Sequence, residues 1–93
     1  MATDEMDAAI KEIAKEIQRI QDMAYINYKP LVDSIVTRNA SEDEVEHLLD
    51  YMLDVCLDEK MLGLFKRVCR RYYKQYPEMI ASEIYTYKEL YDD

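Results

Sequence analysis

Few side chains in this sequence could carry metal or covalent chemistry, and the first to consider is its only histidine. His47 lies at helical spacings from Asp43, Asp50 and Asp54. On one exposed helix, side chains one turn apart supply two metal ligands at best, whereas a metal site needs several ligands that converge in a fixed geometry. We therefore expect a surface histidine among carboxylates, and we predict neither a metal site nor a cofactor.

The other candidates for catalysis are the two cysteines, Cys56 and Cys69, whose separation of 13 residues fits neither a redox pair nor half of a zinc site. Both fall on apolar helix faces, whereas reactive thiols are exposed in electropositive surroundings. We expect no carboxylate on an apolar face, where burial would tune an acid–base pair. The single glycine excludes a glycine-rich phosphate loop. We predict that the protein is not an enzyme.

Composition limits the fold and the partners. The 93 residues are 49% hydrophobic and include only one glycine and two prolines. This is enough apolar surface for one core and too few turn residues for a β-fold or a disordered linker, so we predict a single all-α domain over residues 1–93. A net charge of −8 disfavours nucleic acid and anionic membranes as partners. Reduced cysteines and an acidic N-terminus without a signal-peptide pattern predict a cytoplasmic protein.

The first 38 residues carry apolar side chains at intervals of three or four, which predicts one long helix. These side chains are Met6, Ile10, Ile13, Ile17, Ile20, Ala24, Tyr28, Leu31 and Ile35. The stripe is narrow, like the seam of a coiled coil, and it stays in phase across Pro30. Because proline removes a backbone donor and clashes one turn back, we expect the helix to be kinked or broken near Pro30. The stripe either packs across the rest of the chain or dimerises.

Residues 41–93 contain signals for three more helices. Ser41 with Glu44 forms a capping-box pattern, and Asp58 is the expected N-cap of the following helix. The connection between the two is so short that we predict an antiparallel hairpin. The second helix of the hairpin should run from residue 59 to about 76, and Pro77 suits the first position of a return helix. The prediction is a small bundle of four to five helices.

Charge is sorted along this region. Residues 42–59 hold eight acids and no base, and residues 60–74 hold six bases and no acid. The bases share one helix face, which is either a solvated face with pairs across the hairpin or a surface that recognises a partner. The candidate interaction surface comprises Lys66, Arg67, Arg70, Arg71, Lys74 and Tyr85. The candidate acidic face comprises Asp43, Glu46, Asp50 and Asp54.

Tyrosine is the most unusual component, with nine copies against one phenylalanine and no tryptophan. A tyrosine ring can be buried while its hydroxyl stays at a wet edge, so these residues suit the margin of a small core. They are also enriched in protein interfaces. Tyr85 falls off the apolar stripe of its helix, and we expect it to be exposed.

Three functions remain open. The first is a non-enzymatic protein–protein interaction module, or small accessory or regulatory subunit, that self-associates as a homodimer; its partner would be another protein or a second copy of itself. The second is an acidic antidote or decoy, which would neutralise a basic partner through the acidic face. The third is a nucleic-acid-binding regulator that uses the basic helix face from Lys60 to Lys74, although the acidic helix beside it would be repelled by phosphates. We favour the first function, in a protein that does not act at a membrane.

Overall fold

The computed structural model describes residues 2–55 and 58–91, and all regular structure in these two ranges is helical. The four helices are α1 (Ala2–Thr37), α2 (Glu42–Asp54), α3 (Glu59–Tyr72) and α4 (Pro77–Tyr91). The predicted all-α bundle is confirmed. Of the expected four or five helices, the structure has four.

Helix α1 is continuous over 36 residues and includes Pro30, so a break into two helices does not occur. The proline removes the donor that would bond to the carbonyl of Ile26. Ile26 and Pro30 are both exposed, so water can solvate that carbonyl and lower the cost of the missing bond. The helix can therefore continue through the proline.

The other helices begin where the sequence signals place them. The Ser41 hydroxyl accepts a hydrogen bond from the Glu44 amide at 3.2 Å, and the Asp58 carboxylate accepts one from the Met61 amide at 2.9 Å. The capping box is only half formed, because the Glu44 carboxylate pairs with Arg38. Helix α3 ends at Tyr72, four residues before the expected end, and a turn follows in which the Gln75 and Tyr76 amides both donate to the Tyr72 carbonyl.

The core lies among α2, α3, α4 and the last third of α1. Helix α1 packs on α3, and α2 packs on both α3 and α4. Side chains from all four helices are almost fully buried: Val32, Ile35, Val45, Leu49, Met52, Met61, Leu64, Phe65, Val68, Tyr72 and Ile80. We call residues 24–55 and 58–91 the packed unit.

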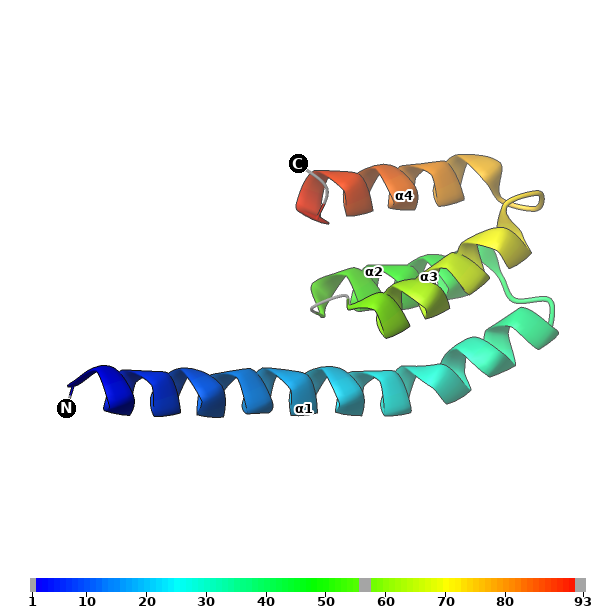
Figure 1. The fold of residues 1–93 in the computed structure, drawn as a ribbon. Helices are drawn as coiled ribbons and strands as arrows, with labels where there is room; N and C mark the ends of the chain where they lie inside the picture. The colour runs from blue at the N-terminus through cyan, green and yellow to red at the C-terminus, as the bar shows by residue number, and fades with distance from the viewer. Residues whose placement is uncertain (1, 56–57, 92–93) are drawn as a thin grey trace.

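The first half of α1 extends beyond the packed unit, as the blue end of the ribbon in Figure 1 shows. The molecule measures 59 × 28 × 16 Å, with a radius of gyration of 16.5 Å. A compact domain of this length would have a radius of about 12 Å. None of the described helices combines the length and apolarity needed to cross a bilayer.

One member of the stripe expected along α1, Leu31, lies outside the core beyond Pro30, whereas Ile35 of the same stripe is 2% exposed. Leu31 is 53% exposed, whereas Val32 is fully buried. A stripe with a 3.5-residue repeat drifts around a straight helix, which has 3.6 residues per turn. Val32 takes the core position between Tyr28 and Ile35, so the expectation for Leu31 is wrong.

Candidate functional site

The most distinctive surface lies on the protruding half of α1. Five apolar side chains on it have no covering element, and each is between 48% and 64% exposed. We call them the α1 stripe: Met6, Ile10, Ile13, Ile17 and Ile20. Single exposed apolar residues are ordinary, but a contiguous apolar row on a soluble surface marks an interaction site.

The spacing within the α1 stripe is that of a coiled-coil core. Intervals of four, three, four and three residues place isoleucine at successive a and d positions of a heptad. The flanking e and g positions are Asp7, Ala9, Ala14, Glu16, Gln21 and Met23. The two alanines are small and only Asp7 and Glu16 are charged, so a second helix can approach the stripe closely.

The basic helix face divides into two rows that lie in different environments. Arg67 and Arg71 face α1, where the Arg67 guanidinium lies 2.8 Å from the Asp33 carboxylate. Arg71 donates to the Val36 carbonyl at 3.0 Å and to the Arg38 carbonyl at 3.1 Å. These contacts cap the C-terminus of α1, so this row has a structural use.

Asp33 is the acidic side of that contact. Hydrogen bonds from Lys29 and from Arg67 hold the pKa of the Asp33 carboxyl below its ordinary value. Lys29 lies one helical turn before Asp33 and contacts it at 2.8 Å. The carboxylate thus links α1 to α3 in its ionised form.

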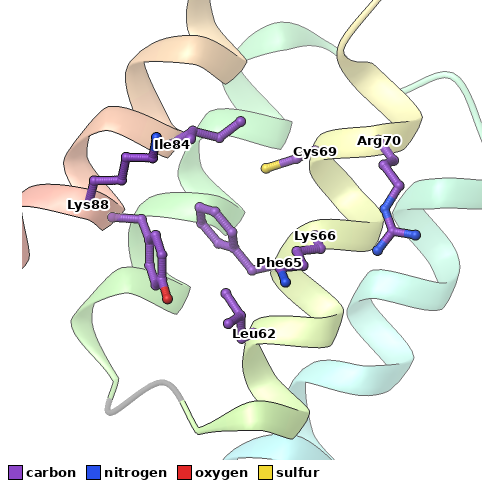
Figure 2. Close-up of a pocket in the computed structure, with 8 residues that line it drawn as sticks. Leu62, Phe65, Lys66, Cys69, Arg70, Ile84 and Lys88 are labelled. Carbon is purple, nitrogen blue, oxygen red and sulfur yellow. The ribbon is translucent and has the colours of Figure 1, made fainter. Parts of the chain in front are cut away.

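The second basic row, Lys66 and Arg70, borders a cavity of about 310 Å³ between α3 and α4. Its apolar lining comes from Leu62, Phe65, Cys69, Ile84 and Tyr87, and Lys88 stands on the α4 side. Figure 2 shows Leu62, Phe65 and Cys69 on the side of α3 that faces Ile84 and Lys88 of α4, with Arg70 farther round α3. We call this cavity the α3–α4 groove. Lys74 lies beyond it in an exposed turn, and Tyr85 is 65% exposed and does not line it, so the structure does not bring the six predicted surface residues together.

A carboxyl group from α4, which was not predicted from the sequence, lies beside the candidate acidic face. Glu83 is only 6% exposed, and its Oε2 atom has no hydrogen-bond partner among the described residues. Burial, a hydrogen bond with Asp50 and the charges of Asp50 and Glu46 together raise the pKa of Glu83 to about 8. Asp43, Asp50 and Asp54 are exposed, and Glu46 is half-buried.

The expectation that no carboxylate lies on an apolar face is therefore wrong. The signal was present, because Glu83 lies three residues after Ile80 and four before Tyr87, on the stripe of its own helix. The side chain reaches inward toward other acids. It is consequently held as a neutral carboxyl group near pH 7.

Of the two cysteines, Cys69 is a free thiol with 7% exposure, and Cys56 lies outside the described residues. Burial, with a smaller contribution from the charge of Glu83, raises the pKa of the Cys69 thiol to about 12. A thiol that stays protonated is a poor nucleophile. Within residues 2–55 and 58–91, no group of three histidine, cysteine or acidic side chains could hold a metal ion.

Several tyrosines join the helices by bonding to carbonyls at helix ends. The Tyr72 hydroxyl lies 2.6 Å from the Ile35 carbonyl and 2.7 Å from the Arg38 carbonyl, and it accepts a bond from the Ala40 amide at 3.0 Å. The Tyr91 hydroxyl donates in the same way at the C-terminus of α2, with the Leu53 and Val55 carbonyls each at 2.8 Å. Helix ends leave such carbonyls without partners, so these tyrosines stabilise the packed unit from its margin.

Comparison with known proteins found no match to this chain among family models, curated proteins or solved structures. Its function therefore has to be argued from its own surfaces. The two that stand out are the α1 stripe and the α3–α4 groove.

Proposed function

We propose that the chain is a non-enzymatic interaction module, or a small accessory subunit, that self-associates in the cytoplasm through the α1 stripe. The observation that carries this proposal is the exposure of four isoleucines, Ile10, Ile13, Ile17 and Ile20, in one row with coiled-coil spacing. A second copy supplies a matching row. Covering each side chain contributes roughly 1 kcal/mol, because about half of its apolar area is still exposed to water.

The exposed area of the chain supports the same proposal. A folded monomer of 11.1 kDa is expected to expose about 5,700 Å². This chain exposes 6745 Å², so the excess is about 1,100 Å² by the same scaling. A standard stable interface hides about 800 Å² on each partner. The excess is therefore large enough for one such interface.

The protruding helix also needs a partner for its own stability. Residues 5–20 are exposed throughout and pack against none of the other described helices. Within this part of α1, two local contacts stabilise the helix: an exposed ion pair between Glu16 and Arg19 at 3.7 Å and a hydrogen bond from Gln18 to Asp22 at 3.0 Å. Such pairs contribute only a few tenths of a kcal/mol, and an unsupported helix of this length is marginal in water. Association supplies the missing packing.

The proposed assembly is a homodimer, since two-fold symmetry is the commonest way for one surface to pair with itself. Isoleucine at both a and d also suits coiled coils of three or four helices. A trimer or tetramer would change the number of copies in the proposed assembly but would keep self-association through the α1 stripe. A kink of α1 at Pro30 and an antiparallel α2–α3 hairpin with α4 as its return helix belong to the same proposal. This geometry would let the stripes meet while the packed units stay apart.

Two other functions compete with self-association. An acidic decoy would use the row from Asp43 to Asp54, but Glu46 in that row is half-buried and Glu83 beside it is neutral near pH 7. A nucleic-acid regulator would use the basic face, but Arg67 and Arg71 already contact α1. Neither function uses the α1 stripe.

Sedimentation equilibrium of the full chain tests the proposal. The wild type should sediment above the 11.1 kDa monomer mass, and the double variant Ile13→Asp/Ile17→Asp should sediment at that mass with its packed unit folded. The matched control is Ala8→Asp, on the same part of α1 but opposite the stripe, which should associate like the wild type. A monomeric wild type that captured a basic protein or a duplex oligonucleotide would favour the competing functions.

A further inference from the structure

The α3–α4 groove combines an apolar floor with a cationic rim. Phe65 and Tyr87 approach each other across it with ring centroids 5.9 Å apart. The volume of this open groove, about 310 Å³, lies at the lower end of the range for ligand sites, which starts at about 300 Å³. The floor therefore accepts a few apolar side chains rather than a large enclosed ligand.

The rim consists of Lys66 and Arg70 on α3 and Lys88 on α4, all of them exposed. Unlike Arg67, these three bases take part in none of the ion pairs that join residues in the described ranges. They stand together in a chain whose net charge is −8. Because salt screens charges beyond about 8 Å, a ligand at the groove is attracted by the rim more than it is repelled by distant acids.

We propose that the α3–α4 groove binds an amphipathic helix of a partner protein. Large apolar side chains of that helix would sit on Leu62 and Ile84, and acids on both of its flanks would meet the rim. This binding is independent of self-association through α1, because the two surfaces share no residue.

The dimensions of the groove favour a helix. Its lining extends along α3 from Leu62 to Arg70, which is about 12 Å of helix. Apolar anchors at positions i, i+4 and i+7 of a bound helix span about 10 Å, so they match this length. The groove has cations on both walls, which suits a helix with acids on both of its flanks. A fatty acid fits less well, because it carries a single charge at one end. Helix α1 of a second copy fits less well, because its apolar stripe pairs with another α1 in the proposed self-association and only two acids, Asp7 and Glu16, flank that stripe.

The test uses the full-length chain with labelled methyl groups and two synthetic helical peptides of three heptads. Both peptides carry leucine anchors; one has glutamate at the flanking positions and the other has lysine. The glutamate peptide should shift the methyl resonances of Leu62 and Ile84 and should bind more weakly as salt rises. The lysine peptide should not bind.

Charge-reversal variants locate the binding. Arg70→Glu and Lys88→Glu, one on each wall, should each weaken binding of the glutamate peptide by about tenfold. Lys74→Glu is the matched control, one turn after Arg70 and outside the groove, and should change binding by less than about twofold. Circular dichroism checks that all three variants keep the wild-type helix content.

Several results would overturn the proposal. Equal binding of the two peptides would show that the charges of the rim do not select the partner. Equal effects of Arg70→Glu and Lys74→Glu on binding would show that the peptide does not bind in the groove. Methyl shifts caused by dodecanoate but not by the glutamate peptide would assign the groove to an acyl chain. Larger shifts of the Leu62 and Ile84 methyl resonances with a peptide of residues 5–24 of this chain than with the glutamate peptide would assign the groove to a second copy; binding of that peptide without these shifts would belong to the α1 stripe.

Discussion

The two halves of α1 have similar apolar patterns and opposite environments. Ile35, near its C-terminus, is 2% exposed and packs in the core, whereas Ile17, in the α1 stripe, is 48% exposed. Both are isoleucines on an apolar helix face. The comparison teaches that periodicity shows which face of a helix is apolar. It does not show whether the same chain or another chain buries that face.

Matched alanine substitutions should show the largest difference between the two halves. Ile35→Ala leaves a cavity in the core and should lower the free energy of unfolding by about 2–5 kcal/mol. Ile17→Ala removes no packing within the chain and should change it by less than about 0.5 kcal/mol. Urea denaturation at a concentration where the chain is monomeric measures both values. Similar losses would mean that the first half of α1 packs against its own chain.

The tyrosine hydroxyls should stabilise only the packed unit. Tyr72→Phe removes the hydroxyl that contacts Ile35, Arg38 and Ala40, leaving buried polar groups unpaired, so it should cost about 1–3 kcal/mol. Its neighbour Tyr73 is 56% exposed, and Tyr73→Phe should be nearly neutral. Thermal unfolding of both variants checks this difference. Equal effects would contradict the role given to the Tyr72 hydroxyl.

Glu83 makes the stability of the packed unit depend on pH. Its folded-state pKa is raised to about 8 from an ordinary value of 4.5, so between these values the folded chain keeps a proton that the unfolded chain releases. The contribution of Glu83 to stability therefore falls as the pH rises through this window and levels off above it.

Glu83→Gln removes this dependence with a side chain of similar shape. The variant should match the wild type near pH 4 and exceed its stability by about 1–3 kcal/mol near pH 9. Urea titrations at a series of pH values measure the difference, and the carboxyl groups common to both proteins cancel. A constant difference across the series would contradict the raised pKa.

The smallest effect is expected at the start of α2. Ser41→Ala removes the bond to the Glu44 amide and should cost about 1 kcal/mol. Ser82→Ala, at an exposed position within α4, serves as control and should be close to neutral. An effect of Ser41→Ala no larger than the control would mean that water replaces the cap.

Local signals predicted the helices well because they act within one turn of the chain. Ser41, Asp58 and Pro77 each mark a helix start that the structure confirms. Properties that depend on a distant partner were harder to predict. The division of the basic face arises from packing between helices, which the linear pattern does not encode. The spacing of Glu83 places it on the apolar stripe of α4, but its approach to Asp50 and Glu46 depends on the packing of α4 against α2.

Which residues of the candidate surfaces are free to bind a partner also could not be predicted from the sequence alone. The charge pattern suggested one basic face, but contacts with Asp33 and the end of α1 engage Arg67 and Arg71 and leave Lys66 and Arg70 at the groove. The sequence predicted the apolar row of α1 correctly, and left open whether the row was covered internally. The structure shows that Ile10, Ile13, Ile17 and Ile20 are exposed within the single chain.

Hydrogen exchange of the backbone amides in residues 8–22, measured over a range of protein concentrations, tests the central claim most directly. If a second copy covers the α1 stripe, protection of these amides should increase with concentration, while the amides around Val68 stay protected throughout. Rapid exchange in residues 8–22 at every concentration would contradict the account, and so would protection that does not depend on concentration.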